Sequence, residues 1–343
     1  MTGRTSACNW SCKRSMKPST PARCGQWAEV QFVGHAPGRF WMGCEGYLGV
    51  MISSLDRAWS ARFGGVLLVA LAPLIAGAQQ MPDTLWLVPG EFVLAGDTMP
   101  ALRWLPSADW DTVNVSFHVA ESAPQELVVV NGDTVDHAFD LGVEGWSPVV
   151  LPPGTPVGLT LPALPAGSYA YGSDSERGHV LGAAGLVISG LNDLPHFHWN
   201  LGDWEPSRLA EVSAGGTVDP EAAYVPRQFT VNDRIFPNTL TDPFGHVQIG
   251  VGTSCYITIA NQGSMDHVLH FHGFHVEVLQ ATRHPERLGW TKDTMPFLMG
   301  EVAVVRLDAF QPGMYPVHNH NLIAVTNAGL YPGGMITHLN IAP

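Results

Sequence analysis

Five histidines in the C-terminal third of the chain have the spacing of metal ligands: His267, His270, His272, His318 and His320. Residues two apart on a β-strand point to the same face, so His270 would project beside His272, and His318 beside His320. Two such pairs on neighbouring strands would place four imidazoles on one patch, a ligand set that suits copper, zinc, iron and nickel. A lone buried histidine usually belongs to the core, but two pairs are hard to explain in that way. The spacing therefore predicts a metal site at His270, His272, His318 and His320.

Three further histidines are candidate helpers for this site. His137 stands alone in the run DHAFD, whereas His196 and His198 form another pair in the run PHFHW. The pair could supply additional ligands to the metal patch. The alternative is that a segment containing Trp and His simply packs between two domains, and the sequence leaves both interpretations open.

Short β-strands are the elements that must carry these residues. Runs such as 112–120 (TVNVSFHVA), 256–260 (YITIA) and 302–307 (VAVVRL) alternate apolar and polar residues or form short apolar blocks. No segment has the pattern of a long amphipathic helix. The 37 Gly, 27 Pro and only 14% charged residues also suit an all-β protein. The pattern predicts a sandwich or barrel.

The β pattern occurs twice, which predicts two domains. LVVVN precedes DHAF in the first half and ITIAN precedes DHVL in the second, while AGSYAY and PGMYPV each precede a Gly-containing terminal strand. Two copies of one barrel, at 88–190 and 226–343, account for this repeat. The segment 191–225, which contains Trp, Pro and Asp, is then a linker packed on the barrels.

The N-terminal stretch differs in character from the rest. Four of the five cysteines lie in residues 1–50 without the paired spacing of a zinc site, and we interpret these residues as a non-native upstream extension. Residues 51–78 then have the basic start, the apolar run and the small residues AGA of a signal peptide. Because the apolar run is shorter than the roughly 20 residues of a membrane span, we expect a periplasmic or secreted protein with no stable membrane span after cleavage. The alternative is an uncleaved membrane anchor.

The charge of the chain argues against a nucleic-acid partner. The net charge is −13, and the residues after position 78 carry 9 basic and 27 acidic side chains. Such a surface repels phosphate backbones. We therefore expect no nucleic acid among the partners.

The histidine segments resemble motifs of the multicopper oxidases. Segment 263–273 (GSMDHVLHFHG) is similar to the last-domain motif H-x-x-H-x-H-G of that family, and segment 312–320 (PGMYPVHNH) to its final H-C-H motif. The run FTVNDR resembles the strand before the last domain of the family. The resemblance is specific over 226–343, weaker over 90–190, and does not extend to 1–78. It implies an all-β fold of two cupredoxin-like Greek-key β-barrels, with copper as the cofactor.

The resemblance assigns the C-terminal histidines to two kinds of copper centre. His267 matches the histidine that binds the mononuclear blue copper in the family. His270 and His272 match ligands of the trinuclear centre, and so do His318 and His320.

The blue copper site is incomplete in this chain. Asn319 stands where the family has the cysteine thiolate, and Ala324 where it has the second histidine, while Met335 is a candidate axial ligand. Cys255 lies on a different strand and is interpreted as a small core residue. Since a blue site needs a thiolate and two imidazoles, we predict that the protein has no blue copper.

The N-terminal domain has diverged further from the family pattern. Only His137 remains of its first motif, and Gly172 and Asp174 take the histidine positions of its second motif. A trinuclear centre of eight histidines is therefore not expected, and at most the four C-terminal histidines with one or two helpers remain. The candidate helpers are His267, His137, His196 and His198.

These observations favour an exported copper-dependent oxidoreductase with a His-rich type 2/type 3-like site, acting on a small-molecule substrate or an oxidant such as dioxygen or nitrite. Two alternatives remain: a non-catalytic copper-binding or storage module, and a cell-surface interaction protein with a vestigial site. The sequence leaves open whether the site turns over and whether the chain forms a homo-oligomer.

Overall fold

The computed structural model describes residues 28–29, 39–42, 48–49 and 80–343. The chain divides into two compact units, Met1–Ala70 and Leu71–Pro343. Three short antiparallel strands belong to the first unit: β1 (Ala28–Glu29), β2 (Arg39–Met42) and β3 (Leu48–Gly49). The predicted signal peptide at 51–78 lies outside the described residues. No helix among the described residues is long and apolar enough to cross a membrane.

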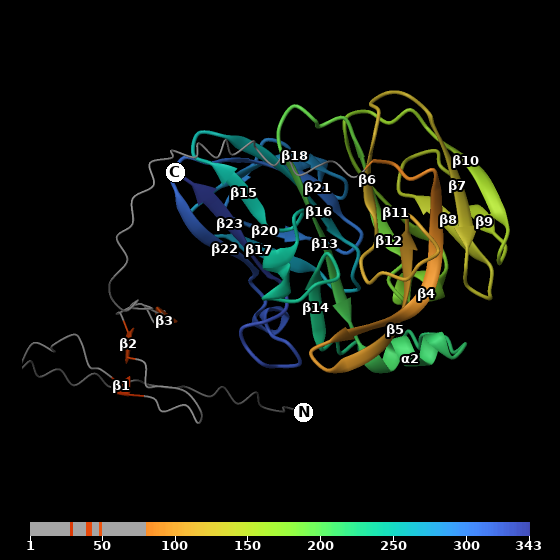
Figure 1. The fold of residues 1–343 in the computed structure, drawn as a ribbon, viewed down its shortest axis with the longest axis horizontal. Coiled ribbons are helices and arrows are strands. Elements are labelled where there is room, and N and C mark those ends of the chain that lie inside the picture. The colour runs from red at the N-terminus through yellow and green to blue at the C-terminus, as the bar shows by residue number, and fades with distance from the viewer. Residues whose placement is uncertain (1–27, 30–38, 43–47, 50–79) are drawn as a thin grey trace, which may run out of the picture. The chain divides into compact units, whose positions relative to one another are not determined.

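Residues 84–189 form a sandwich of two β-sheets, the N-terminal sandwich (Figure 1). One sheet has the strand order β10-β7-β4-β5, and the other has the order β6-β12-β11-β8-β9. Buried apolar side chains, among them Trp104, Phe139 and Tyr171, fill the space between the sheets. The elements are β4 (Thr84–Leu94), β5 (Asp97–Leu105), β6 (Ser116–Val119), β7 (Gln125–Asn131), β8 (His137–Leu141), β9 (Val149–Leu151), β10 (Pro156–Leu161), β11 (Gly167–Ser173), α1 (Glu176–Val180) and β12 (Ala184–Ser189).

Residues 196–342 contribute a second pair of sheets, the C-terminal sandwich. The strand orders are β14-β13-β16-β21-β18-β19 in one sheet and β15-β23-β22-β17-β20 in the other. Its core includes Trp199, Phe271 and Phe297. The elements are β13 (His196–Trp204), α2 (Pro206–Ser213), β14 (Gln228–Val231), η1 (Asn238–Thr241), β15 (Val247–Gly250), β16 (Ser254–Asn261), β17 (His267–Phe271), β18 (Val276–Ala281), η2 (Pro285–Arg287), β19 (Thr291–Lys292), β20 (Thr294–Phe297), β21 (Val302–Asp308), β22 (Gly313–Asn319), η3 (Leu322–Val325) and β23 (Ile336–Ala342).

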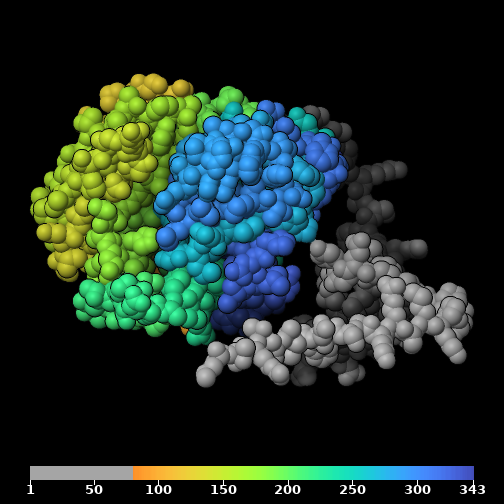
Figure 2. Space-filling model, turned by 180° about the vertical axis from the view of Figure 1, so that it is seen from behind, coloured from red at the N-terminus to blue at the C-terminus, as the bar shows by residue number. Residues whose placement is uncertain are grey.

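The all-β fold class predicted from the sequence is confirmed. Consecutive strands cross repeatedly from one sheet to the other, as in Greek-key sandwiches. The two sandwiches are packed directly against each other (Figure 2). Ser168 at the start of β11, for example, forms hydrogen bonds with Gln280 on β18 through both its backbone N–H and its carbonyl.

Part of the segment expected to be a linker is a strand of the C-terminal sandwich. β13 pairs in parallel with β16 and antiparallel with β14. Phe197, Trp199 and Leu201 of β13 belong to the core of that sandwich. The following helix α2 instead buries Leu209 and Val212 in the core of the N-terminal sandwich. The second sheet pair therefore begins before residue 226, because the apolar residues of β13 complete its core.

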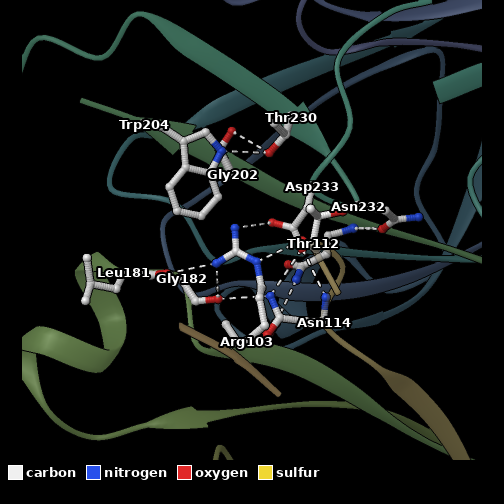
Figure 3. A network of polar contacts seen from close by, with 12 residues as sticks. Arg103, Thr112, Asn114, Leu181, Gly182, Gly202, Trp204, Thr230, Asn232 and Asp233 are labelled. Atoms are coloured by element: carbon white, nitrogen blue, oxygen red, sulfur yellow. Dashed lines mark hydrogen bonds and ion pairs between the residues drawn. The ribbon is translucent and has the colours of Figure 1, made fainter. Parts of the chain in front are cut away.

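A buried arginine joins the two sandwiches (Figure 3). The fully buried guanidinium of Arg103 on β5 lies 3.3 Å from the carboxylate of Asp233, which follows β14. The guanidinium also donates to the carbonyls of Thr112 and Leu181, at 2.9 and 2.8 Å. Burial lowers the pKa of Arg103, and the charge of Asp233 offsets part of this effect. Both charged groups lose their hydration on burial, and the ion pair between them forms only when the two sandwiches are packed together.

Replacing Arg103 by methionine is expected to lower the free energy of unfolding by about 3–5 kcal/mol, because the buried carboxylate of Asp233 would lose its cation. Equilibrium denaturation of the two proteins measures this difference. Adding Asp233→Asn to the variant should recover part of the loss. A loss smaller than about 1 kcal/mol, the value of a surface pair, would argue against this account of the interface.

Candidate metal centre

Strand register brings the four predicted ligands together. β17 and β22 are antiparallel neighbours, and His270 stands opposite His318. The ring centroids of His270 and His272 are 4.6 Å apart, those of His272 and His318 5.1 Å, and those of His270 and His320 5.9 Å. The closest atoms are the Nε2 atoms of His272 and His318, at 3.0 Å. We call these residues the four-histidine cluster.

Strand alternation separates this cluster from His267. Along β17, His267, Leu269 and Phe271 are buried, whereas His270 is half-buried. Successive side chains of a strand point to opposite faces. His267 therefore points into the sandwich, while His270 lies on the outer face of the sheet, and the same alternation buries Asn319 between His318 and His320.

Hydrogen bonds hold two of the rings in defined orientations. His318 Nδ1 lies 2.9 Å from the carbonyl oxygen of Asn319, and since a carbonyl only accepts, Nδ1 carries the proton and Nε2 of the neutral ring holds a lone pair. His270 Nδ1 lies 2.7 Å from Thr294 Oγ1. A supporting contact at one ring nitrogen, with the other left for an ion, is the usual arrangement of metal-binding histidines.

The environment of the cluster favours uncharged imidazoles. Burial lowers the pKa of His272, and the neighbouring rings of His270 and His318 lower it further. Burial likewise lowers the pKa of His318, although its bond to the Asn319 carbonyl acts in the opposite direction. Neutral imidazole is the form that coordinates metals.

The donor set fits copper, although the side chains are not in a finished coordination geometry. In the described part of the chain, no group of three or more His, Cys, Asp or Glu is arranged as a metal site. The 3.0 Å between Nε2 of His272 and Nε2 of His318 matches two ligands of one ion at bond lengths of about 2.0–2.1 Å, at roughly a right angle. Without an ion, one of these two nitrogens must carry a proton, because two lone pairs would repel each other. A cation can take the place of that proton, and the exposed ring of His320 can turn towards it.

A hydrogen-bond network occupies the position of the blue copper site. His267 Nε2 donates to Asp203 at 3.0 Å, so Nδ1 of the neutral ring accepts from the side-chain amide of Asn319 at 2.9 Å. The same amide nitrogen lies 3.3 Å from the sulfur of Met335. Ala324, nearby in sequence, is buried and brings no ligand atom. The amide hydrogens of Asn319 thus stand between an imidazole and a thioether, where the family resemblance would place a copper ion.

The N-terminal sandwich repeats this design without its imidazole cluster. His137 is buried between Asp133, at 3.0 Å, and the hydroxyls of Ser173 and Ser175, both at 3.0 Å. His137 therefore lies in its own network and does not join the four-histidine cluster. Its strand register, with Asp140 opposite Gly172, matches that of His270 and His318. Burial raises the pKa of Asp140, with the charge of Asp174 adding to the effect.

The structure places the remaining candidates elsewhere too. His196 and His198 lie on β13, in the sheet opposite β17 and β22. Cys255 is a buried free thiol whose pKa is raised by burial, and it belongs to the hydrophobic core. A core position was expected for this residue.

Two partners of the histidines lie outside the histidine motifs of the sequence. Asp203 lies 64 residues before His267, and Thr294 lies 24 residues after His270, so no local motif connects either pair. Asp266, which directly precedes His267 in the sequence, accepts a hydrogen bond from the backbone N–H of Met299.

Comparison with solved structures shows which class of protein shares this fold. A blue copper oxidase from Nitrosomonas europaea matches with a TM-score of 0.63 and 22% identity over 75% of this chain and 85% of that chain. A copper nitrite reductase from the same organism matches with a TM-score of 0.56 and 17% identity, over 77% and 94% of the two chains. A laccase from Botrytis aclada matches with a TM-score of 0.58 and 15% identity, over 77% and 53%. The fold is thus that of the cupredoxin-type copper oxidases and copper nitrite reductases.

A sequence family narrows this class. Residues 217–332 match the family model described as multicopper oxidase. Among curated proteins, none matches the chain. The similarity to multicopper oxidases therefore holds for residues 217–332, a stretch that includes both segments of the four-histidine cluster.

Proposed function

We propose that this protein is an exported copper-dependent oxidoreductase in which His270, His272, His318 and His320 bind copper and no blue copper centre is present. The observation that carries the proposal is the pair of facing Nε2 atoms of His272 and His318, 3.0 Å apart within a group of four imidazoles. The multicopper oxidase match over 217–332 supports the choice of metal. Copper bound there would supply one-electron redox chemistry.

The surrounding residues would prepare the rings for this role. The Asn319 carbonyl keeps the proton of His318 on Nδ1, so that Nε2 faces His272. Thr294 orients His270. The exposed position of His320 leaves one side of the cluster accessible to a small oxidant or substrate.

One observation favours a second candidate, a copper-binding module without turnover. Asn319 replaces the thiolate that, by resemblance, would carry electrons to the cluster, and its amide is engaged by His267 and Met335. Electrons would then have to reach the cluster directly from a small reductant at the surface.

Redox cycling distinguishes the two candidates. The copper-loaded protein should lose its Cu(II) paramagnetic resonance signal on addition of a small-molecule reductant and recover it when dioxygen or nitrite is added, over repeated cycles. A signal that a reductant removes but no oxidant restores would favour the binding module. Failure to retain copper at all would contradict both candidates.

Export is part of the proposal and rests on the signal-peptide pattern at 51–78. The secreted or periplasmic form is expected to begin near Gln79. N-terminal sequencing checks this, and a product that retains residues 1–50 would contradict it.

A further inference from the structure

Three imidazoles from both sandwiches gather at their interface, away from the four-histidine cluster. His118 lies on β6 of the N-terminal sandwich, and His196 and His198 lie on β13 of the C-terminal sandwich. The rings of His118 and His196 are 5.5 Å apart, edge to face. Burial, followed by the neighbouring imidazole of His118, lowers the pKa of both His196 and His198 to about 3. The two buried rings are therefore neutral near neutral pH.

His196 is held at one ring nitrogen and has no hydrogen bond at the other. Its Nε2 lies 2.8 Å from the hydroxyl of Thr258, and that hydroxyl lies 2.6 Å from the hydroxyl of Ser168 in the N-terminal sandwich. Its Nδ1 is buried and makes no hydrogen bond of good geometry within the described residues, and a weaker contact with the backbone of Leu191 opposes part of the lowering of its pKa. The residue as a whole is 8% exposed. A ring with one supporting contact and one unpartnered nitrogen is prepared for an ion.

A cavity between the sandwiches borders this group of histidines at His198. It has a volume of about 190 Å³, and His198, which stacks on Phe244, is part of its wall. Ser116 and Asn200 line the same cavity. Ser116 lies two residues before His118 on β6, and Asn200 lies two residues after His198 on β13. Residues two apart on a strand share a face, so each of these polar side chains lies on the same face as its histidine. The Oδ1 atom of Asn200 is buried without a hydrogen-bond partner among the described residues. The cavity wall therefore has a polar atom that a bound water could satisfy.

We propose that His118, His196 and His198 form a second metal site, between the two sandwiches, that takes a divalent first-row transition metal such as zinc. Imidazole suits zinc, copper and nickel, and three imidazoles with a fourth position for water are a known coordination of zinc. The cavity beside His198 can supply that water, since its volume holds several water molecules. The bound ion would link the sandwiches through side chains from both.

Binding requires a rearrangement of side chains rather than of strands. The three rings do not yet converge on one point. Nowhere in the described residues are three or more His, Cys, Asp or Glu side chains already arranged around a metal position. His118 is half-buried and its ring can change rotamer, whereas His196 is fixed by Thr258. The movement is therefore expected mainly at His118.

Zinc titration of a protein whose four-histidine cluster has been disrupted tests the proposal. Full-length protein with His270→Ala and His318→Ala is the background for this titration. It is titrated with zinc chloride in a calorimeter, and one zinc ion per chain is expected to bind. Further replacement of His118 or of His198 by alanine should weaken this binding at least about 100-fold, more than the loss of a supporting contact. His284→Ala in the same background is the matched control, because His284 is bonded to Glu286 at the surface, and it should leave the affinity unchanged.

Thermal unfolding distinguishes a loss of zinc binding from a loss of folding in these variants. His118→Ala removes only a half-buried ring, so its melting temperature without zinc should stay close to that of the background protein, while its zinc-induced rise should disappear. Unchanged zinc affinity in both the His118 and the His198 variants would overturn the proposal. Absence of zinc binding to the background protein would also overturn it, whether or not the four-histidine cluster binds copper.

Discussion

Replacing His270 and His318 together by alanine is expected to remove the copper bound by the four-histidine cluster, with an affinity loss of at least about 100-fold. The double change removes the middle of the cluster, since His270 stands opposite His318 and these two rings each contact the other three at centroid distances of 4.6–6.3 Å. Loss of supporting contacts alone already costs metal sites 10–100-fold. Two remaining imidazoles would not hold copper against a competing chelator. Metal analysis after dialysis against a chelator measures the effect as copper per chain.

Two single variants serve as controls for this experiment. His275→Ala changes an exposed histidine that immediately precedes β18 and should leave bound copper unchanged. His267→Ala should also leave the cluster's copper in place, although it should lower stability, because it opens the buried contact with Asp203. If the His267 variant lost all copper while the double variant kept it, the ligand assignment would be wrong.

Replacing Asn319 by cysteine is expected to create an intense visible absorption band in the copper-loaded protein supplied with imidazole. A thiolate at this position would join the Nδ1 atom of His267 and the sulfur of Met335, which now lie 2.9 and 3.3 Å from the Asn319 amide. Free imidazole would fill the ligand position left by Ala324. A trigonal site of two imidazoles and one thiolate, with a weak axial thioether, is the blue copper arrangement. The unmodified protein should show no such band.

Asn319→Ser is the matched control for the cysteine variant, because serine is similar in size to cysteine but provides no thiolate. It should lack the band under the same conditions. A folded cysteine variant without the band would show that the buried network cannot be reopened for an ion. The band in the unmodified protein would mean that Cys255 is recruited or that the motif is misaligned.

The strands were predictable where one face is buried and the other exposed, as in β17 with its alternating burial. β13 was assigned to a linker although its first six residues, HFHWNL, alternate polar and apolar side chains. Its polar face is buried as well, so the strand has no exposed face. Its two histidines were consequently assigned to a linker rather than to a sheet.

The site divides in the same way. The four histidines follow from two local H-x-H runs and one strand pairing, and so they could be predicted. Asp203 and Thr294 could not, because their contacts depend on how distant strands pair. His118 gave no signal at all, since its neighbours His196 and His198 come from the other sandwich.

Anomalous diffraction from crystals of the copper-loaded protein, recorded at the copper absorption edge, locates the bound copper directly. We expect a peak at about 2 Å from the facing Nε2 atoms of His272 and His318, with the rings of His270 and His320 turned towards it. A copper peak beside His267 and Met335, or no peak at the four-histidine cluster, would contradict it.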